Sequence, residues 1–344
     1  MKIKLVAASD EHIQLYPMIK PKVRNRLSDM GIEFVDKGQD MILYHTYRAP
    51  KELRDSTLNS GCPVMILERI ASARIYSRKY ISYPNVVGVL KSTIFRDLIL
   101  DNSEFNVTNN YPECDFKNNY HSRVIAESLG RNYKYTNPPD LIPEESFKKV
   151  ELWYNFASYQ MMDLYIHEKD VLNRKRPYDI GFMGTTKYSA SSELITAHRT
   201  KCMDTINSLK NVNNEIFPHR VKGKENYLNN ILNSKIGISP WGLGEKCYRD
   251  FEVIYGGGLL VKPDTSFVLD WIDTYDPKNK YYIPCATDFS DLQEIVDKVK
   301  SSWDSYLEFR ESARNRLIDR CWKPKHIAKH IHDVFHRCSE RIQS

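Results

Sequence analysis

Short apolar runs recur along the first half of the chain, and longer mixed segments separate them. The runs are Ile3–Ala8, Asp40–His45, Val64–Glu68 and Asn85–Leu90. They are mostly continuous rather than alternating, which is typical of strands buried on both faces of a parallel sheet. The segments between them are long enough for helices, as around Tyr16–Met30. The pattern therefore predicts a parallel sheet with helices on both faces.

A second series of the same kind follows Asn173–Pro177. Its predicted strands are 178–183, 215–221, 235–239, 259–262 and 283–287, and its predicted helices are 193–209, 225–233, 245–255 and 290–300. Between the two series, Val107–Glu127 is polar and predicts a loop, whereas Glu144–Glu168 has helical spacing. Two doubly wound α/β units of similar size fit this order better than one large sheet.

The length of 344 residues suits two domains. We predict an N-terminal Rossmann-like domain over residues 1–165 and a C-terminal one over residues 166–320. The remaining segment, 321–344, carries an apolar stripe and predicts an amphipathic helix that could pack back toward the N-terminal domain.

Composition changes this picture little. Apolar residues make up 41% and charged residues 27%, which is ordinary for a globular protein. The net charge of +6 suits an anionic ligand without requiring nucleic acid, and we expect no nucleic-acid partner. The seven cysteines are scattered and form no C-x-x-C pair, which favours reduced thiols and a cytoplasmic location. No apolar stretch approaches the roughly 18 residues that a transmembrane helix needs.

The stretch Ser239–Gly244 follows a predicted strand and precedes a predicted helix. In an open α/β sheet the ligand lies beyond the carboxyl ends of the strands. Backbone N–H groups at such a junction favour an anion such as phosphate, and Gly242 and Gly244 allow close approach to the backbone. The junction is therefore a candidate phosphate site.

The helix predicted next carries Glu245, Arg249 and Glu252 at positions i, i+4 and i+7, which share one face. Arg249 can neutralise a diphosphate with its forked donors, and Glu252 can accept two ribose hydroxyls. An ordinary Glu245–Arg249 pair within the helix explains the spacing equally well. We expect Gly256–Gly258 to end this helix.

A second strand end, Asp179–Lys187, combines a glycine, two threonines and a lysine before a helix that contains His198 and Arg199. It lacks the G-x-x-x-x-G-K-[ST] spacing of a P-loop, and no G-x-G-x-x-G is present, so an ATPase and a nicotinamide dehydrogenase are disfavoured. Both strand ends should lie at the same edge of one sheet.

Together these motifs resemble the C-terminal donor domain of GT-B glycosyltransferases, nearest to the exostosin type and to bacterial spore-coat and capsule transferases. The resemblance covers about residues 175–315. It rests on Ser234, Pro240 and Gly242 at the strand end, on Arg249 and Glu252, and on Gly256–Gly258.

The resemblance implies two Rossmann-like domains facing across a cleft, with Glu252 on the ribose of a nucleotide sugar, Arg249 on its diphosphate and Gly184–Thr186 on the phosphate or sugar. The predicted donor-binding residues are Gly184, Thr185, Thr186, Lys187, His219, Arg220, Ser239, Pro240, Trp241, Gly242, Gly244, Glu245, Tyr248, Arg249 and Glu252. Retaining enzymes of this fold often carry two glutamates eight residues apart, whereas Glu245 and Glu252 are seven apart. The choice between inversion and retention therefore stays open.

Two further interpretations concern charge and acid–base chemistry. His219, Arg220 and Lys222 would meet the base or the diphosphate, or else form a solvated basic turn. A base for the acceptor hydroxyl would be Asp10, with His12 second and Glu68 as a rival, although each of these also suits an ordinary surface position. We expect no metal and no cofactor, because Asp-x-Asp and H-E-x-x-H are absent.

The sequence thus favours a metal-independent glycosyltransferase that uses a UDP-sugar, or second a GDP-sugar, and a hydroxyl of a glycan or other acceptor. The alternative is a non-catalytic module of the same fold that binds a glycan or a polyanion.

Overall fold

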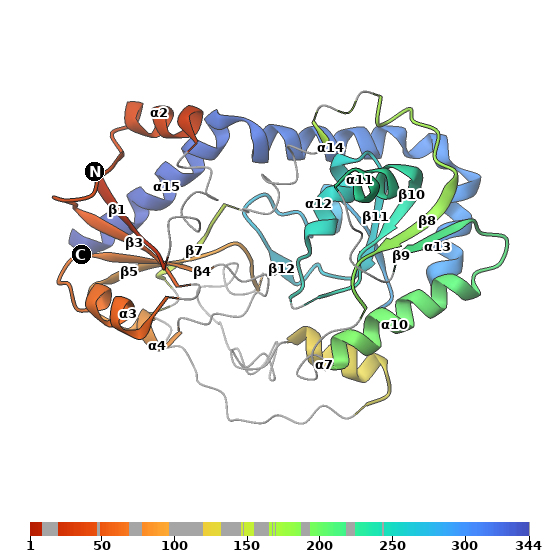
Figure 1. Ribbon diagram of the computed structural model, residues 1–344, viewed down its shortest axis with the longest axis horizontal. Helices are drawn as coiled ribbons and strands as arrows, with labels where there is room; N and C mark the ends of the chain where they lie inside the picture. The colour runs from red at the N-terminus through yellow and green to blue at the C-terminus, as the bar shows by residue number, and fades with distance from the viewer. Residues whose placement is uncertain are drawn as a thin grey trace.

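The protein is described by a computed structural model. It describes residues 1–8, 20–46, 49–68, 78–95, 120–131, 146, 148–154, 165–166, 168, 170–186, 193–217, 224–242 and 244–343. Two separate parallel sheets, each with helices around it, make up the two ends of the molecule (Figure 1).

The first sheet contains six strands in the order β2-β1-β3-β4-β5-β7, and every neighbouring pair is parallel. Its strands are β1 (Lys2–Val6), β2 (Glu33–Phe34), β3 (Met41–His45), β4 (Val64–Glu68), β5 (Val86–Lys91) and β7 (Val150–Leu152). All residues of β3, β4 and β5 are buried, which explains their continuous apolar runs. The accompanying helices are α2 (Pro21–Asp29), α3 (Lys51–Leu58) and α4 (Arg78–Ile81).

The second sheet contains five parallel strands in the order β13-β11-β10-β8-β9. Its strands are β8 (Tyr178–Met183), β9 (Asn214–Phe217), β10 (Ser234–Ile238), β11 (Leu259–Pro263) and β13 (Ile283–Cys285). The helices that follow these strands are α10 (Glu193–Ser208), α11 (Lys224–Asn233), α12 (Tyr248–Tyr255) and α13 (Leu292–Ser301). Two 3-10 turns, Pro277–Asn279 and Trp303–Tyr306, complete this half.

Both sheets are doubly wound in the same way. The first strand of each lies between the second and the third, so the direction of winding reverses between β1 and β3 in one sheet and between β8 and β10 in the other. Ligands bind beside such switch points, outside the carboxyl ends of the strands. The predicted fold class, an α/β protein with two Rossmann-like units, is confirmed by this topology.

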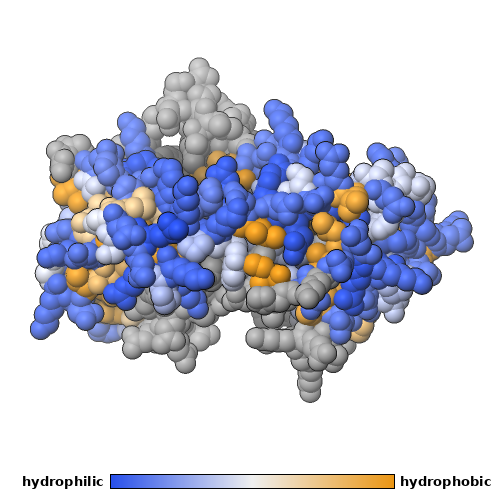
Figure 2. Space-filling model, turned by 90° about the horizontal axis from the view of Figure 1, so that it is seen from above, coloured by the Kyte–Doolittle hydropathy of each residue, from blue (hydrophilic) through white to orange (hydrophobic). Residues whose placement is uncertain are grey.

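Two long helices run along the top of the molecule from one unit to the other (Figure 1). Helix α14 (Leu307–Trp322) contacts α12 of the second unit, and α15 (Pro324–Gln343) packs against α2 and β5 of the first. Seen from above, the outer surface is mostly hydrophilic with small apolar patches (Figure 2). The apolar side of α15 is buried, with Ile327, Ile331 and Phe335 in the core of the first unit.

The two units also meet through the segment that follows β5. Its strand β6 (Ile94–Phe95) pairs antiparallel with β12 (Val268–Leu269), which belongs to the second unit. In addition, Lys246 Nζ donates to the carbonyl oxygen of Ser92 at 2.8 Å. Helix α7 (Tyr120–Ser128) contacts α10 across the same divide. Among the described residues, no helix is both long and apolar enough to cross a membrane.

His330 predicts a pH dependence of stability. It lies on α15 against the ring of Trp271, 4.5 Å between centroids, and burial lowers its pKa to about 4. Since the unfolded chain takes up this proton near pH 6.5, the stability contributed by neutral His330 is complete above that pH and is lost as pH falls toward 4. We expect His330→Gln to gain about 1 kcal/mol relative to wild type between pH 7.5 and 5.5 in urea unfolding. A pH-independent difference between the two proteins would refute the assignment.

Candidate active site

The residues predicted after β8 and β10 come together at the switch point of the second sheet. Gly184–Thr186 directly follow β8, and Ser239–Gly242 directly follow β10, its neighbour in the sheet. The two strands are parallel, so their carboxyl ends lie at the same edge. The sequence prediction that these two strand ends form one site is consistent with this placement.

Helix α12 begins later than predicted. Its first residue is Tyr248, because the backbone N–H of Cys247 donates to the Asp250 carboxylate at 3.0 Å and caps the helix there. Glu245 lies before the helix with its side chain fully buried. Glu245 therefore does not share a helix face with Arg249 and Glu252, and the prediction is wrong for this residue. The predicted intrahelical Glu245–Arg249 pair is wrong for the same reason. Arg249 and Glu252 do share the helix, three residues apart.

The three glycines end α12 as predicted. Gly256 is the C-cap, and Gly257 adopts φ +72°, a conformation that favours glycine. Arginine side chains satisfy the carbonyls exposed at this end: Arg314 donates to Tyr255, Arg176 to Gly256 and Arg310 to Gly257. These cations also suit the negative end of the helix dipole. The glycines thus end the helix, and the three arginines hold that end in place.

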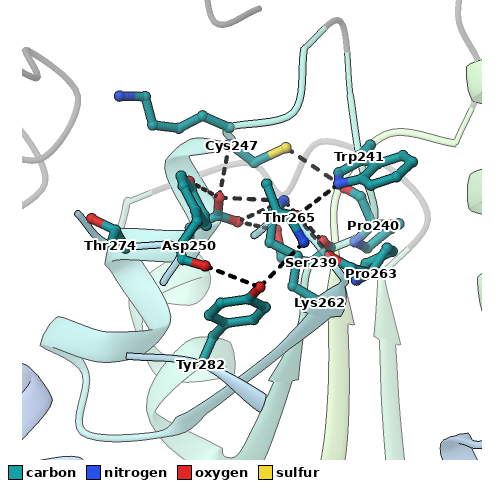
Figure 3. A network of polar contacts seen from close by, with 12 residues as sticks. Ser239, Pro240, Trp241, Cys247, Asp250, Lys262, Pro263, Thr265, Thr274 and Tyr282 are labelled. Atoms are coloured by element: carbon teal, nitrogen blue, oxygen red, sulfur yellow. Dashed lines mark hydrogen bonds and ion pairs between the residues drawn. The ribbon is translucent and has the colours of Figure 1, made fainter. Parts of the chain in front are cut away.

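Asp250 is the centre of the polar network beneath the site (Figure 3). Its carboxylate accepts the Ser239 hydroxyl at 2.5 Å, the Tyr275 hydroxyl at 2.6 Å and the Cys247 N–H. Lys262, at the end of β11, forms an ion pair with it at 3.3 Å, and both side chains are completely buried. One carboxylate therefore joins the ends of β10 and β11 to the start of α12.

The side chains of the Ser239–Gly242 segment point into the protein. Trp241 is 1% exposed, and its indole N–H donates to the Thr265 hydroxyl at 3.0 Å. Pro240 is buried, and its carbonyl accepts the Cys247 thiol at 3.6 Å. A ligand at this strand end would therefore meet the backbone rather than the rings of Trp241 or Pro240.

Two guanidinium groups converge beside Gly184. A Cβ atom at Gly184 would lie 1.9 Å from Arg249 Nη2 and 3.4 Å from Arg199 Nη1, so any larger residue would displace the Arg249 guanidinium. Arg199 donates through Nε to the Trp241 carbonyl and through Nη1 to the Thr185 carbonyl, each at 3.0 Å. The guanidinium of Arg249 lies over the Phe182 ring, 5.2 Å from its centroid. Like charges are therefore concentrated at the switch point.

Two donor atoms of Arg249 are available to a ligand. It is 7% exposed, yet its Nε and Nη1 atoms have no hydrogen-bond partner among the residues that the structure describes. Leaving buried charged donors unsatisfied is costly unless a ligand completes them. A planar guanidinium with free N–H groups matches phosphate oxygens in a forked geometry. The arrangement can therefore bind an anion.

Glu252 lies next to this cationic centre. It is 5% exposed and accepts a hydrogen bond from the Tyr227 hydroxyl of α11. Burial raises the pKa of Glu252, whereas Tyr227 and Arg249 oppose that rise. A carboxylate has more acceptor sites than one hydroxyl fills. Glu252 therefore keeps acceptor capacity for sugar hydroxyls close to Arg249.

Several predicted site residues remain to be placed. Thr185 is partly exposed, Thr186 and Gly244 are buried, and Tyr248 is 49% exposed at the start of α12. Five predicted residues lie outside the described residues: Lys187, His219, Arg220, Asp10 and His12. Glu68, the rival base, is completely buried and forms a 3.1 Å ion pair with Lys91. Glu68 thus pairs with a neighbouring strand at the end of β4, and its role as a rival base stays a prediction.

Sequence reasoning missed three contributors. Asp250 stands between Arg249 and Glu252, and its spacing of three residues from Cys247, which is that of a capping box, is the sequence signal for its role. The role of Arg199 leaves no such signal, because the two carbonyls it binds are distant in sequence. Tyr227 is likewise far in sequence from its partner, because it lies 25 residues before Glu252.

Acidic side chains lie close to three histidines of α15. His326 lies near Asp319 at 3.6 Å, His332 near Asp333 at 3.3 Å and His336 near Glu340 at 3.3 Å. Within the described ranges, no group of three or more His, Cys, Asp or Glu residues could hold a metal ion.

Comparisons with known proteins are limited to distant structural likeness. No family model and no curated protein matches the chain. An α-glucosyltransferase (AGT) in complex with UDP aligns with 97% of this chain and 99% of its own, at 11% identity and a TM-score of 0.46. A glycosyltransferase from Rickettsia africae aligns with 98% of both chains, at 12% identity and a TM-score of 0.47. TarM aligns with 86% of this chain and 54% of its own, at 11% identity and a TM-score of 0.45.

These structural neighbours are glycosyltransferases, but the likeness is too low to assign an activity to this chain. One AGT structure also contains a 13-mer DNA. The expected absence of a nucleic-acid partner therefore stays a prediction.

Proposed function

We propose that the chain is a glycosyltransferase that moves a sugar from a nucleotide sugar to a hydroxyl of an acceptor. One observation carries the proposal: buried Arg249 presents two unpaired donor atoms beside Arg199 and Gly184, at the switch point of a doubly wound sheet. This is where such a sheet binds nucleotides, and the chemistry of the site is that of a phosphate receptor.

The neighbouring groups extend the phosphate site to a nucleoside diphosphate. Glu252 lies one helical turn after Arg249, and its carboxylate would accept ribose hydroxyls while Arg249 binds the diphosphate. The backbone after β8 and β10 would surround the phosphates, because the side chains of Ser239, Pro240 and Trp241 face inward. We also propose that this ligand contacts Lys187, His219 and Arg220.

The reaction needs stabilisation of the leaving group. When the bond from the sugar to the diphosphate breaks, negative charge builds up on the phosphate oxygen that departs. The preorganised guanidinium group of Arg249 would stabilise that charge without having to reorganise. It would supply the neutralisation that a divalent metal gives in other transferases, so we propose that no metal is required.

The acceptor hydroxyl has to lose a proton as it attacks the sugar. The first unit would present the acceptor, with Asp10 or His12 after β1 as the base. Whether the sugar is inverted or retained stays open in this proposal. Among donors, the sequence resemblance places UDP-sugars first and GDP-sugars second.

A hydrolysis and transfer screen tests the proposal. The chain should cleave or transfer from at least one UDP-, GDP- or ADP-sugar, and the rate should persist in EDTA. Complete loss in EDTA with recovery on Mn²⁺ or Mg²⁺ would overturn the metal-independent mechanism. Binding of a nucleoside diphosphate with no turnover for any donor would instead indicate a non-catalytic binding module.

Glu252→Gln tests the ribose role. The amide offers one acceptor oxygen where the carboxylate offers two, while size and helix propensity barely change. We expect nucleoside diphosphate affinity to fall about tenfold, since a charge-assisted hydrogen bond is worth roughly 1.5 kcal/mol or more. The readout is calorimetric titration with ribose and 2′-deoxyribose ligands.

Wild type should discriminate against the 2′-deoxy ligand, and the variant should do so less. Tyr227→Phe is the matched control, because it removes the protein's hydrogen bond to Glu252 but keeps the carboxylate. Undiminished discrimination in Glu252→Gln would make Glu252 a structural residue.

A further inference from the structure

Arg199 contacts three segments that carry the proposed site. From α10 it donates to the Thr185 carbonyl after β8 and to the Trp241 carbonyl after β10, each at 3.0 Å. Its third nitrogen, Nη2, lies 3.8 Å from the Cys247 sulfur at the start of α12. One buried side chain, 5% exposed, therefore links both strand ends and the following helix.

The two arginines of the site, Arg199 and Arg249, have different roles. The guanidinium nitrogens of Arg199 are engaged with Thr185, Trp241 and Cys247, whereas Nε and Nη1 of Arg249 have no partner within the described part of the chain. Arg249 is therefore suited to bind the ligand, and Arg199 is suited to hold the surrounding backbone.

We infer that Arg199 is a positioning residue for the anion site and acts through Arg249. The inference rests on the proposed function and adds a residue to it. Arg199 fixes the distance between the strand end at Gly184 and the strand end at Gly242. The close approach of Arg249 to Gly184 depends on that distance. Lysine cannot replace Arg199, because one ammonium cannot reach three groups in a fixed planar fork.

Arg199→Lys is the first test, with Arg176→Lys as the matched control. Arg176 is also 5% exposed and also donates to backbone carbonyls of separate segments, including Ser234 at 2.8 Å and Val171 at 2.9 Å. It lies at the opposite end of α12, where it donates to Gly256. Both variants keep the charge, so only the place of the lost contacts differs.

A second pair of variants moves the Arg199 side chain without replacing it. A Cβ atom at Gly242 would lie 3.0 Å from Arg199 Nη2, whereas one at Gly256 would lie 3.1 Å from the Glu252 carbonyl. Gly242→Ala should therefore displace the guanidinium, and Gly256→Ala is the control with an equally tight contact at the far end of α12. This pair decides the question if a lysine variant fails to fold.

The readout is calorimetric titration of full-length chains with inorganic pyrophosphate and, separately, with UDP. We expect Arg199→Lys and Gly242→Ala to weaken pyrophosphate binding about tenfold or more, while Arg176→Lys and Gly256→Ala stay within about threefold of wild type. In the double variant Arg199→Lys, Arg249→Met, affinity should fall no further than in Arg249→Met alone, because Arg199 acts through Arg249.

Equal losses in the site and control variants, or additive losses in the double variant, would overturn the positioning role. If wild type binds pyrophosphate as tightly as UDP, the nucleoside adds no affinity and the proposed function fails. The pyrophosphate affinities of the site and control variants still decide the role of Arg199 in that case. If wild type binds neither ligand, both are overturned.

Discussion

Asp250→Ala should cost about 3–5 kcal/mol of unfolding free energy, the typical loss when one partner of a buried ion pair is removed. The ammonium of Lys262 would be left in a completely buried position, 0% exposed. The Ser239 and Tyr275 hydroxyls would lose their acceptor at the same time. Urea unfolding monitored by circular dichroism measures the change.

Asp264→Ala is the control for Asp250→Ala. Asp264 is exposed and accepts hydrogen bonds from the N–H of Ser266 at 2.9 Å and the hydroxyl of Tyr282 at 3.2 Å, with no ion pair among the described residues. Its replacement should cost less than about 1 kcal/mol, as exposed substitutions usually do. A cost below about 1 kcal/mol for Asp250→Ala as well would show that Asp250 does not hold the strand ends together.

Arg249→Met should weaken nucleoside diphosphate binding by about 1.5–3 kcal/mol, or roughly tenfold to 150-fold. The variant removes the two unpaired donor atoms and keeps an unbranched apolar side chain over Phe182. Affinity for the nucleoside alone should stay unchanged, because the phosphate contacts are what the variant loses. Parallel titrations with UDP and uridine measure both.

The control for Arg249→Met is Arg314→Met. Arg314 donates to the Tyr255 carbonyl at 2.8 Å, at the far end of the same helix. It should affect stability but leave both ligands bound as in wild type. Equal losses for UDP and uridine in Arg249→Met would contradict a phosphate role for Arg249.

The strands were predictable because their environment leaves a simple mark on the sequence. A strand buried on both faces has to be apolar throughout, and β3, β4 and β11 are buried along their whole lengths. The prediction for Tyr178–Met183 coincides with β8. The parallel arrangement was predictable from the alternation with helices, since parallel neighbours need crossover connections.

Predictions failed where a short element depends on distant partners. Glu144–Glu168 was expected to be helical, but Val150–Leu152 forms β7, because its backbone pairs with β5. The predicted loop 107–127 overlaps α7, which begins at Tyr120 and contacts α10. Helix spacing and polarity describe a segment by itself and carry no information about such partners.

The same limit applies to the site. Glycines and the Arg249–Glu252 spacing were visible because they are local features. The Asp250–Lys262 pair and the contacts of Arg199 join residues between 12 and 48 positions apart. Only the fold brings these groups together, so the support of the site had to be found in the structure.

The central claim is that the diphosphate of a nucleotide sugar binds at the β8–β10 switch point. A crystal structure with bound UDP tests it most directly. We predict diphosphate oxygens about 2.7–2.9 Å from Nε and Nη1 of Arg249, beside Gly184, with the ribose toward Glu252. A diphosphate bound elsewhere, with these two nitrogens still unpaired, would contradict the account.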